Sequence, residues 1–225
     1  MHSITAVIPA YNEATRIRPV LEVLQHAPQV REILVVDDGS EDDTAEVATD
    51  CGVRVIRLPE NQGKGTALRT GAIVARGDLL VFFDADLRGL TLDHVRALIV
   101  PVLDARADMT VGEFRGGRAA TDLAQFLAPH ISGQRCLFRD FFLSVPFVEG
   151  SRSGVEIALT VHAHACKLTV FTVLLPGITH TLKEEKLGIV QGSLARGRMY
   201  LDIFSTLGQY YLTTREHPQH PVVGK

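Results

Sequence analysis

The chain has little cysteine and no pattern that would join it into a disulfide framework. Its three cysteines, Cys51, Cys136 and Cys166, are odd in number, widely spaced and outside any C-x-x-C motif. This usage argues against a secreted disulfide scaffold and against a zinc site built on cysteine pairs. A reducing compartment, and therefore a cytoplasmic location, is expected.

Long apolar runs and long runs of one charge are also missing. No stretch reaches the roughly 18 apolar residues of a membrane-spanning helix, and residues 1–9 lack the basic and apolar regions of a leader. With 26 acidic and 23 basic residues the formal net charge is −3, and no basic stripe indicates nucleic acid. We expect a soluble protein with no integral membrane segment and no nucleic-acid partner.

The composition favours one globular unit. Hydrophobic residues make up 46% of the 225 residues and charged residues 22%, and no repeat or low-complexity linker interrupts them. This length suits one α/β domain and is short for two. We predict a single domain over residues 1–215 and a flexible tail at 216–225, which contains two prolines.

Apolar strands and amphipathic helices alternate through the first part of the chain. Ser40 is the predicted cap of the second helix. Alternation of this kind predicts a mostly parallel central sheet flanked by helices, a Rossmann-like α/β fold. The predicted strands are 4–9, 33–37, 53–58 and 79–83, and the predicted helices are 16–25, 40–50 and 66–75.

The later part of the chain is less regular. We divide the domain into a nucleotide-binding half (1–90), an acceptor and metal-completing half (91–187) and a C-terminal helix (188–211). That last helix would pack on its own domain or on a second subunit of a homodimer. The other predicted elements are a helix at 92–103, a strand at 109–113, a helix at 153–165 and a β-rich run at 168–175.

Polar residues gather directly after the predicted strands. They form clusters at 12–13, 37–38, 61–65 and 84–86. In parallel sheets, ligands bind beyond the carboxyl ends of the strands. The pattern therefore predicts a site assembled from four consecutive turns.

The acid pair Asp84 and Asp86 follows the apolar strand at 79–83. Where a strand ends and the chain turns, two acids separated by one residue can address one cation. Mg²⁺ or Mn²⁺ held there would bridge two phosphates and stabilise the charge that develops on a leaving diphosphate. A lone D-x-D also occurs as two solvated turn acids, so the neighbouring motifs decide its meaning.

The segments before this acid pair complete a known combination. In order they are Ile8-Pro9-Ala10-Tyr11-Asn12-Glu13, Val35-Val36-Asp37-Asp38-Gly39-Ser40 with Asp43-Thr44, and Asn61-Gln62-Gly63-Lys64-Gly65 with Ala67. Together with Asp84-Ala85-Asp86 they resemble the nucleotide-sugar-binding half of family 2 glycosyltransferases. The resemblance implies a GT-A fold and a metal-dependent enzyme that transfers a hexose from a UDP- or GDP-sugar to a small-molecule acceptor.

The resemblance also implies which residues hold the donor. Carboxylates suit the nucleoside because base N–H and ribose O–H groups are donors. Lys64 stands between two glycines and would contact a phosphate or a sugar hydroxyl, the alternative being a solvated loop lysine. The residues expected at the donor are Pro9, Ala10, Tyr11, Glu13, Asp37, Asp38, Lys64, Asp84 and Ala85.

A later stretch resembles glucosyl-3-phosphoglycerate synthases more specifically. Gly154-Val155-Glu156-Ile157 and the run 175–180 match the segments of that family in which a histidine completes the metal site. His180 is the matching position, so the resemblance implies Asp84, Asp86 and His180 as ligands of Mg²⁺ or Mn²⁺. The alternative for His180 is a surface histidine after a strand.

The acceptor residues are implied by the same family. Gly116-Gly117-Arg118 resembles its phosphoglycerate segment, although the chain then runs one residue longer before Leu123. A guanidinium such as that of Arg118 grips carboxylate or phosphate through paired hydrogen bonds, unless it is simply solvated. The implied acceptor and sugar residues are Gly117, Arg118, Thr121, Ser132 and Gly133.

Three residues are predicted to be catalytic: Asp86, Glu156 and Arg118. Glu156 would bond to sugar hydroxyls or take the acceptor proton. Alternatively, Glu156 stabilises the amino-terminal end of its helix.

Two other enzyme classes and a non-catalytic binding module are alternative functions. Dolichyl-phosphate mannose synthases share the amino-terminal motifs and resemble 184–188, which implies a polyprenyl-phosphate acceptor, but they carry glutamine where this chain has the cation-repelling Arg88. Sugar nucleotidyltransferases open with a glycine-rich loop after the first strand, whereas residues 8–13 contain no glycine. A non-catalytic nucleotide-binding module is the third alternative, and the acid pair argues against it.

Overall fold

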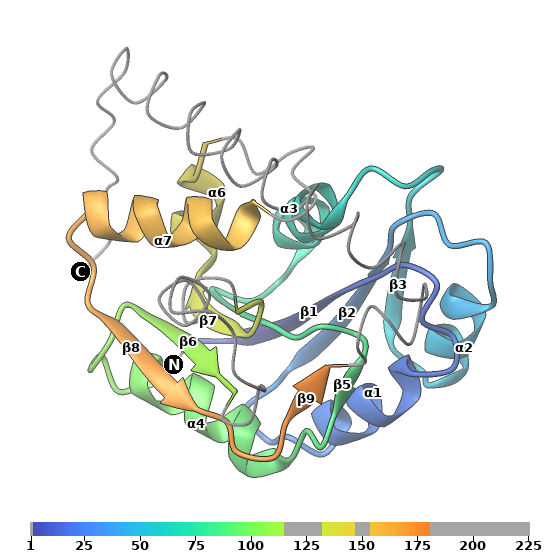
Figure 1. Ribbon diagram of the computed structural model, residues 1–225, viewed down its shortest axis with the longest axis horizontal. Helices are drawn as coiled ribbons and strands as arrows, with labels where there is room; N and C mark the ends of the chain where they lie inside the picture. The colour runs from blue at the N-terminus through green and yellow to red at the C-terminus, as the bar shows by residue number, and fades with distance from the viewer. Residues whose placement is uncertain (1, 115–131, 147–153, 181–225) are drawn as a thin grey trace, which may run out of the picture.

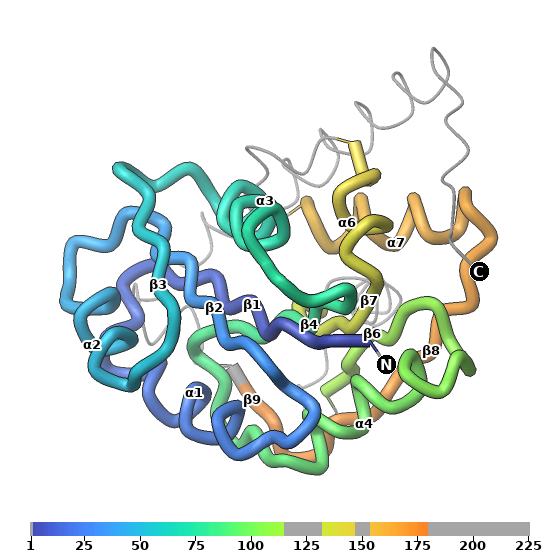
Figure 2. The backbone as a smooth tube through the Cα atoms, turned by 180° about the vertical axis from the view of Figure 1, so that it is seen from behind, coloured from blue at the N-terminus to red at the C-terminus, as the bar shows by residue number. Residues whose placement is uncertain are grey.

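The computed structural model describes residues 2–114, 132–146 and 154–180, which build a seven-stranded sheet between two layers of helices (Figure 1). Figure 2 shows the same sheet from behind. The predicted α/β fold with a mostly parallel sheet is confirmed. In spatial order the strands are β3 (Arg54–Arg57), β2 (Glu32–Asp37), β1 (Ile4–Ala10), β4 (Leu79–Phe82), β7 (Arg135–Phe138), β6 (Met109–Glu113) and β8 (Val170–Leu174).

The helices divide between the two faces of the sheet. One face carries α1 (Ile17–Gln25), α2 (Thr44–Asp50) and α4 (Leu92–Leu103). The other face carries α3 (Lys64–Val74), α6 (Arg139–Ser144) and α7 (Val155–Ala165).

β1 is an interior strand of this sheet and is buried on both faces. Ile4, Ala6 and Ile8 pack into the core under α1 and α4, and Val7 packs into the core under α3. A strand covered on both sides reads as a continuous apolar run instead of an alternating one. This explains why the first strands are recognisable in the sequence.

The strand directions determine which strand ends lie together at one edge of the sheet. β1 is parallel to β2 and to β4, and β2 is parallel to β3. β7 is antiparallel to both β4 and β6, while β6 and β8 are parallel. The amino-terminal end of β7 therefore lies at the same edge as the carboxyl ends of β1, β2 and β4.

Several boundaries differ from the sequence predictions. α2 begins at Thr44, so the prediction that Ser40 caps this helix is wrong. α3 begins at Lys64, two residues before the predicted start. β7, α6 and a two-stranded antiparallel sheet of β5 (Leu87–Arg88) and β9 (Thr179–His180) were not predicted.

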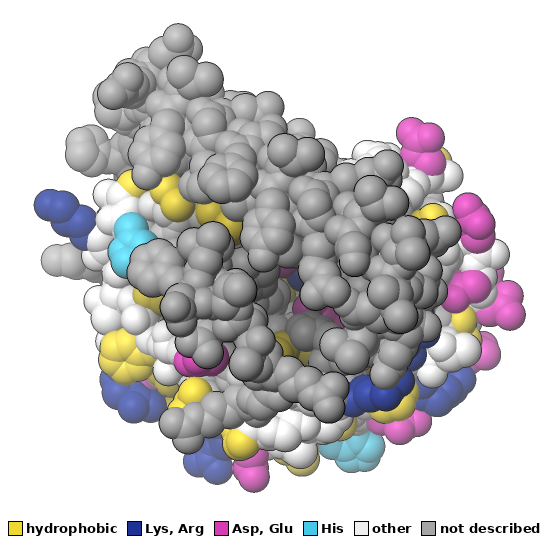
Figure 3. All heavy atoms as spheres, in the orientation of Figure 1, with side chains coloured by type: hydrophobic (Ala, Val, Ile, Leu, Met, Phe, Trp, Pro, Cys, Tyr) yellow, Lys and Arg dark blue, Asp and Glu magenta, His cyan; other side chains and the backbone are white. Residues whose placement is uncertain are grey.

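Acidic side chains border the molecule on the side of α2. Glu41, Asp43, Glu46 and Asp50 are exposed there, and Figure 3 shows acids gathered along this rim.

No helix in the described part of the chain is both long and apolar enough to cross a bilayer. The predicted helix at 188–211 and the tail at 216–225 lie outside the described residues.

Candidate active site

The turns after β1 and β2 are joined to each other by hydrogen bonds. The backbone N–H of Asn12 donates to Ser40 Oγ at 2.9 Å, and Asn12 Oδ1 accepts from the backbone N–H of Glu41 at 2.9 Å. The backbone N–H of Glu13 donates to Thr44 Oγ1 at 2.8 Å. Asn12 has a φ of 55°, a left-handed conformation that asparagine adopts more readily than most residues. Ser40 thus connects two turns, which explains why it is not a helix cap.

The first predicted nucleoside segment lies at the tip of β1. Ala10 ends the strand and is buried, Pro9 is partly buried beside it, and Tyr11 is 39% exposed. The carboxylate of Glu13 binds the guanidinium of Arg16. The exposed ring of Tyr11 is therefore the part of this segment that a base could reach without displacing a protein contact.

Asp37, the last residue of β2, is fully buried. It accepts hydrogen bonds from the backbone N–H of Ser40, at 3.1 Å, and from the Ser40 hydroxyl. Its Oδ2 lies 3.3 Å from Nε of Arg57. In this structure Asp37 shapes the turn after β2, and its predicted contact with a nucleoside stays a prediction.

Asp38 fastens the loop that leads into α3. Its two oxygens accept from the backbone N–H groups of Gln62, at 2.8 Å, and Gly63, at 2.9 Å. Gly39 has a φ of 70°, and a Cβ there would lie 2.5 Å from the backbone carbonyl carbon of Glu60. The turn after β2 therefore approaches the loop after β3 so closely that only glycine fits.

Lys64 binds two carboxylates that come from distant parts of the chain. Its Nζ lies 2.6 Å from Asp84 Oδ1 and 2.7 Å from Glu156 Oε1. Gln134 Nε2 donates to Asp84 Oδ2 at 2.8 Å. Burial by itself lowers the pKa of Lys64, but the charges and hydrogen bonds of Asp84 and Glu156 outweigh burial and raise that pKa above its usual range. Lys64 is thus a fixed cation and not a solvated loop lysine.

Gly133 leaves the space in which this ion cluster forms. A Cβ at residue 133 would lie 2.5 Å from Lys64 Nζ and 2.9 Å from Asp84 Oδ1. Ser132 Oγ donates to Gln134 Oε1 at 3.0 Å, which orients the amide toward Asp84. Residues 132–134 therefore position Asp84, a role that the sequence did not indicate for Gln134.

Arg135, the first residue of β7, is a fully buried arginine that sequence reasoning did not select. Its Nε donates to the carbonyl of Ser132 at 3.0 Å, and its NH1 group donates to Thr160 Oγ1 at 3.0 Å. Burial lowers the pKa of Arg135 to about 10, and the nearby charge of Glu156 opposes that shift. The sequence signal that could have identified Arg135 is its place directly after Ser132, Gly133 and Gln134.

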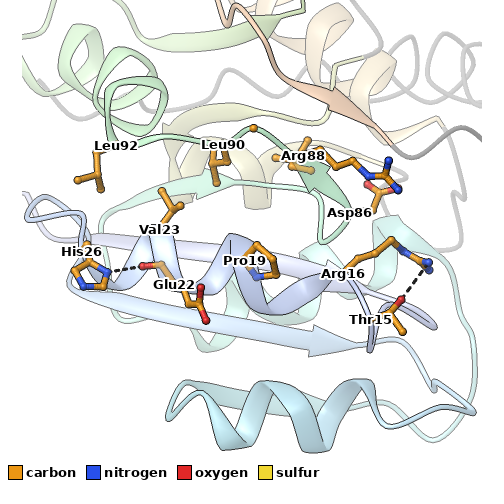
Figure 4. A pocket seen from close by; sticks show the side chains of 12 residues that line it. Thr15, Arg16, Pro19, Glu22, Val23, His26, Asp86, Arg88, Leu90 and Leu92 are labelled. Carbon is orange, nitrogen blue, oxygen red and sulfur yellow. Dashed lines mark hydrogen bonds between the residues drawn. The ribbon is translucent and has the colours of Figure 1, made fainter.

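Asp86 faces a different space from Asp84. A groove of about 700 Å³ runs between α1 and the segment that follows β4 (Figure 4). Asp86, Arg88 and Arg16 lie toward one end of this groove, while Val23 and Leu92 lie toward the other. The full lining comprises Thr15, Arg16, Pro19, Glu22, Val23, His26, Asp86, Leu87, Arg88, Gly89, Leu90 and Leu92.

The small sheet of β5 and β9 brings His180 to this region. In its ladder Leu87, the residue after Asp86, pairs with His180. The backbone of His180, the third predicted metal ligand, therefore lies in space beside the residue that follows Asp86. Within residues 2–114, 132–146 and 154–180, no group of three His, Cys, Asp or Glu side chains is placed to hold a metal ion.

The acceptor prediction falls largely outside the described residues. Gly117, Arg118 and Thr121 lie there, together with the rest of the glycine-arginine segment. Glu156, the second residue of α7, is described and is 5% exposed. The described part of the predicted site therefore comprises the residues predicted for the donor, together with Ser132, Gly133 and Glu156.

A family model decides the classification of this chain. Residues 5–154 match the model described as glycosyl transferase family 2. The chain belongs to glycosyl transferase family 2. The matched range includes all four polar turns and the whole of β7.

Two groups of family 2 proteins are similar to this chain. A glucosyl-3-phosphoglycerate synthase from Mycolicibacterium paratuberculosis is 31% identical over 197 residues, which cover 71% of this chain and 59% of that protein. A dolichyl-phosphate beta-glucosyltransferase from Trichomonas vaginalis is 38% identical over 96 residues, which cover 36% of this chain and 28% of that protein. The chain thus spans less than two thirds of these curated relatives.

Solved structures of the first group extend the likeness to the fold. The glucosyl-3-phosphoglycerate synthase from Mycobacterium tuberculosis, crystallised with Mn²⁺, UDP-glucose and phosphoglyceric acid, has a TM-score of 0.74 at 29% identity, covering 92% of this chain and 80% of that one. The same enzyme with Mg²⁺ and UDP gives a TM-score of 0.76 at 29% identity, covering 92% of this chain and 78% of that one.

Proposed function

We propose that this chain is a metal-dependent glycosyltransferase that moves a hexose from a UDP- or GDP-sugar to a small phosphorylated or carboxylated acceptor, such as 3-phosphoglycerate. One observation carries the proposal. The acid pair that follows β4 lies at the sheet edge where the turns after β1 and β2 are joined, and Asp86 faces a groove there. The likeness to glucosyl-3-phosphoglycerate synthases supports this choice of substrates.

Asp86 and His180 are of the residue types that bind Mg²⁺ or Mn²⁺, and a cation at Asp86 would share its end of the groove with Arg16 and Arg88. Carboxylate oxygen and imidazole are suitable ligands for such ions, and few protein ligands are needed when substrate phosphates supply the others. We assign Asp86 and His180 as the first ligands, because both oxygens of Asp84 bind Lys64 and Gln134. A cation held there would offset the negative charge that develops on the departing diphosphate.

The protein groups would orient the two substrates. The joined turns would hold the nucleoside through Pro9, Ala10 and Tyr11, with Asp37 and Asp38 keeping those turns in place. Glu156 would contact the hexose hydroxyls from α7, while the absence of a side chain at Gly133 leaves space for the contact between Lys64 and Asp84. Holding both substrates in this geometry converts an encounter in solution into a reaction within one complex.

The decisive experiment is a thermal-shift screen of UDP, GDP and their sugars, with and without Mn²⁺. A ligand that binds the native state raises the melting temperature, so the donor base should give a cation-dependent increase. The donor found in this way is then incubated with 3-phosphoglycerate, and the sugar phosphate product is measured. If no nucleotide changes the melting temperature, the proposal fails at its first step.

The cation assignment has its own variant. Asp86→Asn keeps the size of the side chain and removes its charge, so transfer should fall by about a hundredfold or more. Asp104→Asn is the matched control, because Asp104 is an exposed acid at the far end of α4. Equal transfer rates in Asp86→Asn and in the parent protein would contradict the assignment.

A second acceptor class follows from the other similar group. The dolichyl-phosphate beta-glucosyltransferase match has the higher identity, 38%, but covers only 36% of this chain. Offering 3-phosphoglycerate and a short polyprenyl phosphate in parallel separates the two classes. Transfer to the polyprenyl phosphate alone would replace the first proposal.

A further inference from the structure

The ammonium group of Lys64 lies between the carboxylates of Asp84 and Glu156. Lys64 begins α3, Asp84 follows β4 and Glu156 lies in the first turn of α7, yet the three side chains meet at one ammonium group. The side chains of Lys64, Asp84 and Glu156 are 24%, 18% and 7% exposed. Water therefore screens these charges only in part.

Two carboxylates this close require a positive charge between them. Removing one partner of a buried ion pair is costly, because the remaining charge stays desolvated and uncompensated. Carboxylate oxygens that share one point are also suitable ligands for Mg²⁺ or Mn²⁺. The ammonium of Lys64 thus occupies a position that would otherwise attract a divalent cation.

Neighbouring residues keep this arrangement in place. Gln134 holds the second oxygen of Asp84 at 2.8 Å, so a metal ion entering the pair would have to displace Lys64. Gly133 lies against the Lys64–Asp84 contact, and the space has no room for a methyl group. Asp86, two residues further on, lines the groove beside α1 instead.

We propose that Lys64 is the resident counter-ion of the Asp84–Glu156 pair, which excludes divalent cations from that pair and leaves Asp86 as the position where the donor's cation binds. The second half of this statement rests on the proposed function. The first half concerns the protein alone and is tested without any nucleotide.

The test is a Mn²⁺ titration of the nucleotide-free 225-residue chain, with free Mn²⁺ measured by electron paramagnetic resonance. Lys64→Met removes the ammonium and keeps an unbranched side chain. This variant should gain a Mn²⁺ site that binds at least about tenfold more tightly than any site in the parent, because the ammonium no longer offsets the charges of Asp84 and Glu156. Lys64→Arg keeps the positive charge and should titrate like the parent.

A double variant locates the new site. Lys64→Met combined with Glu156→Gln removes one charge of each sign and should lose the gained Mn²⁺ binding. A Lys64→Met titration that overlays the parent's, in protein that still unfolds cooperatively, would overturn the proposal. Extra Mn²⁺ binding that persists in the double variant would overturn it as well.

The Asp86→Asn variant, which keeps Lys64, provides a second test in case Lys64→Met does not fold. If Lys64 keeps the pair closed, Asp86→Asn should bind Mn²⁺ at least about tenfold more weakly than the parent when UDP is present. Undiminished Mn²⁺ binding in this variant would mean that the ion enters elsewhere. If UDP fails to bind the parent at all, the proposed function fails, while the nucleotide-free titration of the Lys64 variants still decides the exclusion.

Discussion

At the scale of single residues, the sequence indicated most residues of the predicted donor site but not their contacts with one another. Lys64, Asp84 and Glu156 were each assigned a contact with donor, cation or acceptor, and the structure brings the three together. Lys64 and Glu156 are far apart in the sequence, and no local pattern predicts that the first turn of α7 contacts the first residue of α3. Such a contact becomes visible only when the elements are placed in space.

Gly133 provides a residue-scale prediction. In Gly133→Ala the new methyl group would lie 2.5 Å from Lys64 Nζ, so the ammonium must leave Asp84 or the backbone must move. We expect transfer to fall by about tenfold or more, with a loss of stability of about 1–3 kcal/mol typical of overpacking. Steady-state kinetics and urea unfolding check the two parts, and unchanged kinetics would mean that the contact between Lys64 and Asp84 is dispensable.

Glu32 provides a second residue-scale prediction, on pH. Burial raises the pKa of this carboxylate, but hydrogen bonds from the backbone N–H of Arg76, from Thr5 and from Arg54 outweigh burial and hold the pKa below its ordinary value of 4.5. A depressed pKa stabilises the fold above the ordinary value, and this contribution is lost as the pH falls through the lowered value.

The Glu32→Gln variant tests this sign. It should be less stable than the parent at neutral pH by about 1 kcal/mol. The difference should shrink as the pH falls below 4.5, where the parent loses its carboxylate bonds. Urea unfolding at a series of pH values measures this convergence, and a constant gap would show that ionisation of Glu32 contributes nothing.

At the scale of elements, the sequence predicted every strand of the seven-stranded sheet except β7, and it missed β5 and β9. β1, β2 and β4 are mostly apolar runs followed by polar turns, which makes them recognisable. β7 lies in the later part of the chain, where strands and helices no longer alternate regularly, and β5 and β9 have two residues each, too few for a periodicity to appear. Ser40 was misassigned because a serine before a helix usually caps it, whereas here it binds a neighbouring turn.

The packing of α3 provides an element-scale prediction. Gly71 faces β1, and a Cβ there would lie 2.5 Å from Val7 Cγ1. Alanine is the better helix former by about 1 kcal/mol, yet the clash in a closed core should dominate, so Gly71→Ala should destabilise by about 1–2 kcal/mol. Adding Val7→Ala removes the opposing methyl groups and should recover part of that loss in a double-mutant cycle. Stabilisation by Gly71→Ala alone would show that the helix can move away.

At the scale of the whole molecule, the two predicted halves are not separate bodies, since they share one sheet. β4 of the first half pairs with β7 of the second, and α7 packs with α3 in a common core. We therefore expect one unfolding transition in urea, with the same midpoint by circular dichroism and by hydrogen exchange of β1 and β6. Two separated midpoints would show that the halves unfold independently.

The direction of β7 has a consequence for how new specificities could arise in this architecture. β1, β2 and β4 reach the edge of the predicted site at their carboxyl ends, but β7 starts there, so residues 132–134 enter the sheet from that edge. Under the proposed function, a substitution in residues 132–134 would alter the contacts with the sugar while every preceding strand keeps its register. Sugar selectivity would then evolve in the segment before one strand, separately from the turns that we propose hold the nucleotide.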